Sequence, residues 1–167
     1  MHQLDLSTVR AVALDVDGTL AGPDSQVSER TILAMRRVAA LGVPVIVLTG
    51  RSRRNTLDIA RRAGVQHVAI ACNGALVIDP ATEQNLAVNP MPASDKETFR
   101  ALADDLGLDL TWWTEREMYV TRQGPMAELI WQLNNERAIV ADPDTLGDAV
   151  VLKMMAMGPP SHLDAVA

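Results

Sequence analysis

The chain of 167 residues has one cysteine, few aromatic side chains and no excess of basic residues. A single cysteine, Cys72, excludes an internal disulfide and disfavours a zinc site built from cysteines. Aromatic residues make up 3% of the chain, so its core must be built from Ala, Val, Leu, Ile and Met. The net charge of −6 argues against nucleic acid or an anionic membrane as the main partner, because both need a basic surface.

Long apolar runs are also missing. The longest, VPVIVL at residues 43–48, is far too short to span a bilayer. The opening segment MHQLDLSTVR lacks the apolar core of a signal peptide, so we expect a cytoplasmic protein with no membrane partner. Apolar residues make up 48% and charged residues 22% of the chain, a balance typical of a globular protein rather than a disordered one.

Apolar runs alternate with helical patterns in the first half of the chain. Strands are predicted over 10–16, 43–50 and 66–75, and helices over 27–41 and 53–64. The first run is continuous, which predicts a strand buried on both faces. This order predicts right-handed βαβ units with parallel strands. The carboxyl ends of the strands, where ligands bind in such sheets, should then meet at one edge.

The ends of the two helices carry recognisable signals. Ser28 is expected to cap the first helix, because its hydroxyl can accept a hydrogen bond from a free backbone N–H group. Gly42 and Gly64 are expected to end the first and second helices, respectively, since glycine tolerates the left-handed conformation found there.

The composition changes near residue 79, where the turn-rich segment 79–95 predicts a hairpin and a linker. We therefore expect two units, residues 1–79 and a separate α+β unit over 80–167. Trp112 and Trp113 are adjacent in a predicted strand and should face opposite sides, with only one of them buried. The second unit should contain a helix, two strands joined near Glu115, a helix and a strand, over 95–107, 108–122, 125–136 and 149–157.

Two aspartates follow the first predicted strand, in the stretch LDVDGTL. A carboxylate at the position of Asp15 is held rigidly, which suits a nucleophile or a metal ligand, while Asp17 can transfer a proton. Gly18 lets the backbone turn and present N–H groups, and Thr19 adds a hydroxyl. Two like charges about 4 Å apart repel by roughly 4 kcal/mol at an effective dielectric constant near 20, so a cation is expected. Oxygen ligands favour Mg²⁺, and the alternative is a solvated turn.

The next two strand ends also carry polar loops. Thr49 and Gly50 can offer a hydroxyl and backbone N–H groups to a phosphate, and Arg51 can add a charge-assisted contact. Asn73 lies in the loop CNGA after the third strand. These groups fit phosphoryl transfer to a carboxylate. Arg51 as a solvated residue at a helix start, and Asn73 as a simple turn residue, are alternatives of equal weight.

The motifs LDVDGTL at 14–20, LTGR at 48–51 and CNGA at 72–75 resemble those of the haloacid dehalogenase superfamily of phosphatases. The similarity is greatest to the Cof-type branch, whose cap domain is inserted after the third strand. The resemblance implies an α/β fold, with a Rossmann-like core that begins with three parallel strands and an incomplete α+β cap.

The resemblance also implies roles for individual residues. Asp15 would form the phospho-aspartate, and Asp17 would act as general acid and base. Mg²⁺ would be held by the Asp15 carboxylate and the Asp17 backbone carbonyl, and Thr49 would bind phosphate. Arg51 and Asn73 match family positions that line the site.

Two family features do not occur in the sequence: a lysine that opens a later helix, and an acidic segment of the type GDxxND. Lys153 lies in VVLKMMAM, which reads as the interior of a cap strand. We therefore expect the chain to stop within the cap. The first strand would then form an uncovered sheet edge, and we expect self-association through it.

The function implied by the resemblance is Mg²⁺-dependent hydrolysis of a small phosphorylated metabolite, such as a sugar phosphate. The alternatives are a truncated non-catalytic fragment or interaction module, and a phosphomutase of the same superfamily. A dinucleotide-binding protein is disfavoured, because DVDGT and not G-x-G-x-x-G follows the first strand.

Overall fold

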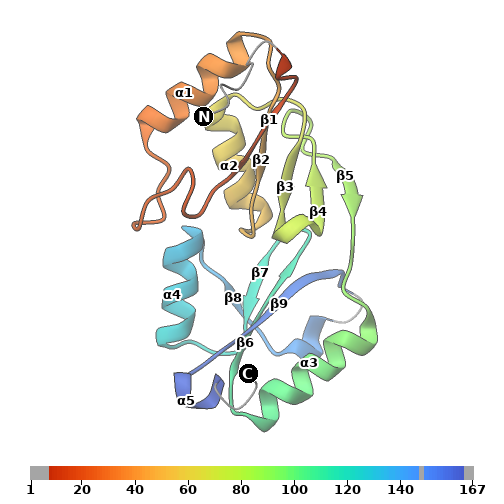
Figure 1. Cartoon of the computed structure of the whole chain (residues 1–167). Coiled ribbons are helices and arrows are strands. Elements are labelled where there is room, and N and C mark those ends of the chain that lie inside the picture. The colour runs from red at the N-terminus through yellow and green to blue at the C-terminus, as the bar shows by residue number, and fades with distance from the viewer. Residues whose placement is uncertain (1–7, 147–148, 164–167) are drawn as a thin grey trace.

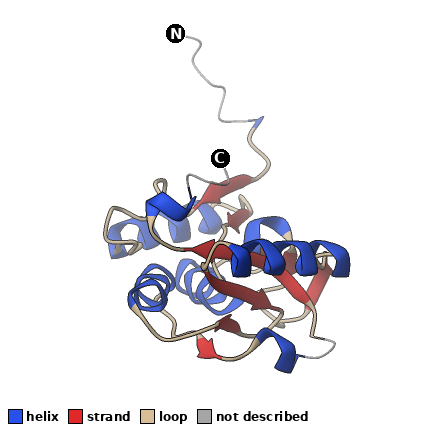
Figure 2. Ribbon diagram, turned by 90° about the horizontal axis from the view of Figure 1, so that it is seen from below, coloured by secondary structure: helices blue, strands red, loops and turns tan. Residues whose placement is uncertain are grey.

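Two β-sheets lie one below the other in the computed structural model, which describes residues 8–146 and 149–163 (Figure 1). The first sheet has the strand order β1-β2-β3-β4-β5 and the second has the order β8-β7-β6-β9. A view from below shows helices packed around the strands (Figure 2). Most of the predicted opening segment, and the end of the predicted second unit at 164–167, lie outside the described residues.

Parallel strands form the first part of the first sheet. Its first three strands pair side by side in the same direction, which confirms the predicted parallel core. An antiparallel hairpin extends this sheet, so the sheet as a whole is mixed. The strands are β1 (Val12–Asp15), β2 (Val45–Leu48), β3 (Ala69–Ala71), β4 (Leu76–Ile78) and β5 (Asn85–Val88), and a 3-10 turn, η2 (Cys72–Gly74), joins β3 to β4.

Helices α1 (Glu29–Ala40) and α2 (Arg53–Ala63) connect the parallel strands. Ser28 caps α1 as predicted, since its side chain accepts a hydrogen bond from the Thr31 N–H at 3.2 Å. Gly64 ends α2 as predicted, in the left-handed conformation with φ of 70°.

The prediction that the first strand is buried on both faces is wrong. Val12 and Leu14 are half-buried, whereas Ala13 and Asp15 are exposed. The reason is the position of β1, which lies at the end of the sheet order and pairs only with β2 among the described strands. The expected uncovered edge is therefore present in the part of the chain that the structure describes.

The second sheet is built mostly from antiparallel pairs around β6. The predicted helix, strand pair, helix and strand are all present, and β8 is an additional short strand parallel to β7. The elements are α3 (Ala93–Asp105), β6 (Asp109–Thr114), β7 (Met118–Val120), α4 (Pro125–Asn134), β8 (Ile139–Val140), a 3-10 turn η3 (Pro143–Leu146), β9 (Val151–Met157) and α5 (Pro160–Leu163).

Both faces of the second sheet are covered, and the prediction that only one of the two adjacent tryptophans is buried is therefore wrong. Trp112 is 1% exposed and lies in a cluster with Ala103 of α3. Trp113 is 2% exposed and belongs to a cluster that includes Leu57 of α2 and Ile130 of α4. The two rings do face opposite sides of β6, but each side has a partner that excludes water.

The cluster around Trp113 joins the two sheets into a shared core, since it contains side chains from α2, β4, β6 and α4. The change from one sheet to the other comes after Val88, the last residue of β5. The expected division of the chain into units at residue 79 remains a prediction. Among the helices that the structure describes, none is long and apolar enough to cross a membrane.

Candidate active site

A tight turn follows β1 and holds the predicted site residues Asp17 and Gly18. The N–H groups of Thr19, Leu20 and Ala21 donate to the Val16 carbonyl at 3.2, 2.9 and 2.8 Å. Gly18 has a φ of +79°, a conformation that side chains with a Cβ atom rarely adopt, so glycine allows the turn. The sequence therefore fixes a sharp reversal immediately after the strand.

Asp15 stands at the tip of β1, with its side chain exposed. One carboxylate oxygen accepts a long hydrogen bond, 3.5 Å, from the Thr19 hydroxyl. In the parallel pairing, Asp15 lies beside Leu48, the residue before Thr49. The strand register thus brings Asp15 to the edge of the sheet where the second loop begins.

The second loop starts at Thr49, which is 4% exposed. Its N–H donates to the Ile70 carbonyl at 2.9 Å, and its hydroxyl accepts from the Arg51 N–H at 3.2 Å. These bonds fold residues 49–51 into a compact loop that connects β2 with α2. The Thr49 hydroxyl is thereby fixed at the carboxyl end of the strand.

Arg51 forms a two-point ion pair with Asp17. The Arg51 Nε donates to Asp17 Oδ2 at 3.0 Å, and Nη2 donates to Oδ1 at 2.6 Å. Other guanidinium donors reach the Ser25 carbonyl at 2.7 Å and the Asn55 side-chain oxygen at 3.0 Å. Arg51 is 5% exposed, so the alternative of a solvated residue at the helix start is wrong.

The third loop is tied to the second by backbone hydrogen bonds. The Asn73 N–H donates to the Thr49 carbonyl at 3.1 Å, and the Cys72 N–H donates to the Arg51 carbonyl at 3.0 Å. A Cβ atom at Gly50 would collide with the side-chain oxygen of Asn73, which explains glycine at this position. Two of the three predicted loops are therefore in direct contact.

A cavity of about 450 Å³ lies at this junction. Four predicted site residues line it: Asp17, Gly18, Gly50 and Arg51. Asp15, Thr49 and Asn73 are not among the lining residues, although strand register and backbone hydrogen bonds place them next to the cavity-lining loops. The loop after β1 adds Gly22, Pro23 and Ser25 to the lining. The rest of the wall comes from β6, α4 and β9, and consists of Trp113, Ile130, Leu133, Asn134, Lys153 and Met155.

The turn after β1 offers oxygen atoms that fit Mg²⁺. The Asp15 carboxylate is exposed, whereas both carboxylate oxygens of Asp17 accept hydrogen bonds from Arg51. Asp17 would therefore contribute its backbone carbonyl in this arrangement. Within residues 8–146 and 149–163 there is no group of three or more His, Cys, Asp or Glu side chains that could hold a metal. The donors that the turn does offer, the Asp15 carboxylate and the Asp17 carbonyl, fit Mg²⁺, which takes one or two carboxylates and keeps several waters.

Cys72 lies beside the site but is not a reactive thiol. Its side chain is buried, and this burial raises the pKa of the thiol to about 11. Because the thiolate is the nucleophilic form, such a cysteine is inert near neutral pH. Cys72 is thus a small buried residue of the core beside the site.

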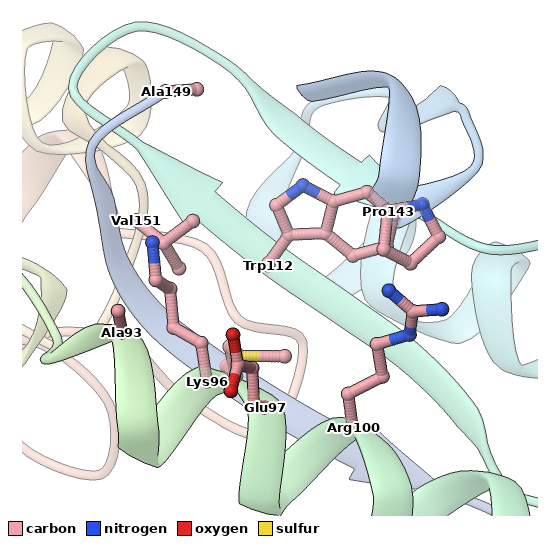
Figure 3. A pocket seen from close by; sticks show the side chains of 9 residues that line it. Ala93, Lys96, Glu97, Arg100, Trp112, Pro143, Ala149 and Val151 are labelled. Atoms are coloured by element: carbon pink, nitrogen blue, oxygen red, sulfur yellow. The ribbon is translucent and has the colours of Figure 1, made fainter. Parts of the chain in front are cut away.

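A second cavity, of about 220 Å³, lies between α3 and the second sheet (Figure 3). Lys96, Glu97 and Arg100 project from α3, and Trp112 lies across from them on β6 (Figure 3). None of the predicted site residues lines this cavity. It is a separate feature on the opposite face of the second sheet.

Comparison with known sequences assigns this chain to a protein family. The family of haloacid dehalogenase-like hydrolases matches residues 12–167, nearly the whole chain. The chain belongs to this family. The resemblance carried by the motifs at the three strand ends is thus confirmed.

Individual members of the hydrolase family are longer than this chain. A Streptococcus pyogenes serotype M6 relative is 25% identical over 163 residues, which are 95% of this chain and 61% of the relative. The pyridoxal phosphate phosphatase YbhA of Escherichia coli is 33% identical over 85 residues, 51% of this chain and 31% of that protein. The chain therefore spans less than two thirds of the length of these relatives.

The fold agrees with solved structures of the family. A haloacid dehalogenase-like hydrolase from Bacteroides thetaiotaomicron superposes with a TM-score of 0.81 at 20% sequence identity. The superposition covers 94% of this chain and 61% of the other chain. The α/β fold predicted from the sequence, with its parallel core, is confirmed by this similarity.

In this member of the hydrolase family, the sequence motifs missed several polar residues that join elements of the two sheets and their helices. Lys153 reaches the Gly50 carbonyl, with its Nζ atom at 3.0 Å. Ser52 donates a hydrogen bond to Glu136. The Asn55 side-chain nitrogen donates to the Asn134 carbonyl at 2.6 Å. No local pattern marks these residues, because their partners lie 79 to 103 positions away in the chain.

Proposed function

We propose that this protein hydrolyses small phosphomonoesters through an aspartyl-phosphate intermediate, with Asp15 as the nucleophile and Mg²⁺ as the cofactor. One observation carries the proposal. Asp17, Gly18, Gly50 and Arg51, from two different loops, line a single cavity beside the strand tip that bears Asp15.

The chemistry divides into two steps. In the first, a carboxylate oxygen of Asp15 attacks phosphorus, the ester P–O bond breaks, and the leaving oxygen takes a proton from Asp17. In the second, Asp17 takes a proton from water, which attacks the phosphorus of the acyl phosphate and releases inorganic phosphate and the Asp15 carboxylate. The Thr49 hydroxyl and the N–H groups of the neighbouring loops bind the phosphoryl oxygens.

Mg²⁺, held by the Asp15 carboxylate and the Asp17 carbonyl, would neutralise charge on the phosphoryl oxygens. Phosphate and Asp15 are both anionic, so they repel each other strongly unless positive charge lies nearby. The positively charged Arg51, buried at the cavity wall, reduces the same repulsion.

Arg51 has a second role in this proposal. It engages both carboxylate oxygens of Asp17, which therefore cannot transfer a proton until one of them is released. A bound phosphate offers the guanidinium group an alternative set of anionic oxygens. We infer that, when substrate binds, Arg51 moves one or more of its hydrogen bonds from Asp17 to the phosphoryl group. Asp17 is then free to act as acid and base.

The cavity walls favour a substrate whose organic part has apolar surface. Ile130, Leu133 and Met155 line the side that faces the loops. Apolar side chains stabilise a ring or alkyl group, but offer no hydrogen bonds to a sugar. The relative from Escherichia coli named as a pyridoxal phosphate phosphatase points to the same class. We therefore expect a small phosphorylated metabolite with a planar ring to be used more efficiently than a sugar phosphate.

The test is phosphate release from a panel that contains pyridoxal 5′-phosphate and several sugar phosphates, with Mg²⁺ and with a chelator. Asp15→Asn should reduce turnover to background, and Asp17→Asn should reduce kcat by about 10²–10⁴-fold. The control is Asp58→Asn on the exposed face of α2, which should leave turnover unchanged.

Three outcomes would count against the proposal. Full activity of the Asp15→Asn variant would remove Asp15 as the nucleophile. Transfer of phosphate to a sugar hydroxyl without release of inorganic phosphate would indicate a phosphomutase. Absence of turnover on the whole panel would favour the alternative of a non-catalytic fragment or interaction module.

A further inference from the structure

Lys153 comes from the second sheet but lies at the loop that precedes α2. It is in the interior of β9, and its ammonium group donates to the Gly50 carbonyl at 3.0 Å. The same nitrogen lies 4.6 Å from the centre of the Trp113 ring. Trp113 is the direct neighbour of Lys153 across the β6–β9 ladder. The ammonium group therefore makes a cation–π contact with the ring, and its hydrogen bond to the loop fixes the position of its nitrogen.

The charge of Lys153 is only partly compensated. Its side chain is partly shielded from water, and this burial lowers the pKa of the ammonium more than nearby Cys72 and Asp17 raise it. None of the carboxylates in the described ranges forms an ion pair with it. A lysine has three N–H donors, and the Gly50 carbonyl takes one of them. A partly desolvated cation whose other N–H donors can still form hydrogen bonds favours an anionic ligand.

Two positively charged side chains line the cavity, and they differ in whether a carboxylate pairs with them. Arg51 is neutralised by the two-point ion pair with Asp17. Lys153 lines the same cavity without such a partner. The surplus positive charge thus lies where the Gly50 loop, the predicted phosphate-binding loop, meets the second unit.

We propose that Lys153 contacts a phosphoryl oxygen of the substrate and is a phosphate-binding residue of this active site. The inference rests on the proposed function, because it takes the ligand of the cavity to be a phosphomonoester. It also gives the second sheet a part in binding, since β9 and β6 position this ammonium group. A purely structural role, in which Lys153 only ties β9 to Gly50, is the rival interpretation.

The first test uses the 167-residue chain and inorganic phosphate. Lysine carrying ¹³C at Cε gives two side-chain signals, because Lys96 and Lys153 are the two lysines of the chain. The spectrum of Lys153→Met assigns them. At constant neutral pH and with Mg²⁺ present, phosphate should shift the Lys153 signal in a saturable way and leave the Lys96 signal in place. No shift, or an equal shift of both signals, would overturn the inference.

The second test measures the consequence for binding, through the amide signals of Gly18 and Gly50. Lys153→Met should raise the Kd for phosphate about tenfold or more, because a charge-assisted contact is lost. Lys153→Arg should recover most of the affinity, since it restores the positive charge. Lys96→Met is the matched control and should have no effect. An unchanged Kd in Lys153→Met would support the structural role and overturn the inference.

The two proposals can fail separately. Asp15→Asn should abolish turnover but keep the phosphate-dependent shift of Lys153. If the shift occurs and Asp15→Asn remains active, the mechanism through Asp15 fails and the binding role of Lys153 holds. If Asp15→Asn is inactive and Lys153→Met binds phosphate and substrate normally, the function holds and the role of Lys153 fails.

Discussion

At the residue scale, the site is organised around a buried guanidinium group. Arg51 donates hydrogen bonds to Asp17, to the Ser25 carbonyl and to Asn55, and so holds the turn after β1 against the first turn of α2. Two of its partners, Asp17 and the Ser25 carbonyl, lie 34 and 26 positions away in the chain and are brought to it by the fold. This single side chain thus links three parts of the site, and we propose that it also takes part in the chemistry.

Replacement of Arg51 by methionine should lower the free energy of unfolding by about 1–3 kcal/mol, because polar partners are left without a donor. The ion pair itself contributes little of this, since the Asp17 side chain is 54% exposed and is screened by water. Urea unfolding measures the change. Arg54→Met, at an exposed position of α2, is the control and should stay within about 0.5 kcal/mol of the wild type. Equal effects of the two substitutions would contradict the structural role of Arg51.

Glu136 makes stability depend on pH. Burial raises the pKa of this carboxyl above its ordinary value of 4.5, and this effect outweighs the hydrogen bond from Ser52. The folded state holds the proton more tightly than the unfolded chain does. The contribution of Glu136 to stability is therefore full below pH 4.5 and is lost as the pH rises through the folded-state pKa.

Glu136→Gln should therefore gain stability relative to the wild type as the pH rises from 4.5 toward neutrality. The measurement is the free energy of unfolding of both proteins at several pH values. Glu128→Gln, on the exposed side of α4, is the control and should follow the wild-type profile. Parallel profiles for Glu136→Gln and the wild type would show that the folded-state pKa of Glu136 is not raised.

At the element scale, the start of α2 is hydrogen-bonded to the end of α4 and to the residues that follow it. Ser52 caps the helix by accepting a hydrogen bond from the Asn55 N–H at 3.2 Å, and it also donates to Glu136. The Asn55 side chain bonds the Asn134 carbonyl at the end of α4. Because the loop at Thr49 leads directly into this helix, the position of α2 determines where the groups proposed to bind phosphate lie.

The other end of α2 depends on a left-handed glycine. Gly64→Ala should destabilise the protein by about 1 kcal/mol, because φ is +70° there and alanine resists this conformation. Space is not the cause, since a Cβ atom would meet only Arg36 Cγ at 3.8 Å. Thermal or urea unfolding measures the loss. Gly22→Ala, where φ is not in the left-handed range, serves as the control, and equal losses would refute the argument from the backbone.

At the scale of the whole molecule, the cavity exists only because the two sheets share a core. One hydrophobic cluster contains Leu57 of the first unit together with Trp113 and Ile130 of the second. Polar contacts around the start of α2 add to this junction. Binding and stability should therefore be coupled across the two units.

The outer edge of the first sheet should mediate self-association, because among the described strands β1 pairs only with β2, and an open strand edge favours pairing with another chain. Sedimentation velocity should show association that increases with protein concentration. Ala13→Lys, at an exposed position of β1, should weaken it, because a charged side chain opposes edge pairing. Ala87→Lys on β5, at the opposite edge, is the matched control. A monomer at all concentrations, or a stronger effect of Ala87→Lys, would contradict association through β1.

Local patterns predicted much of the fold and part of the site. The helix caps at Ser28 and Gly64 depend on bonds within a few residues, so sequence alone was sufficient to find them. Asp17, Gly18, Gly50 and Arg51 were predicted to meet because they follow neighbouring parallel strands, and they line one cavity. These predictions succeed because strand order and strand ends follow from periodicity along the chain.

Only the tertiary structure decided which elements pack against each face of the strands. It buried Trp112 and Trp113 together, left β1 at an edge, and brought Lys153 to Gly50. A pattern of apolar and polar residues indicates which side of an element avoids water, but it does not name the partner that packs there. The sequence by itself therefore determined which polar residues stand at the strand ends of this hydrolase-family chain, because they follow directly from the local pattern. The packing of the second sheet decided that Lys153 lies beside them.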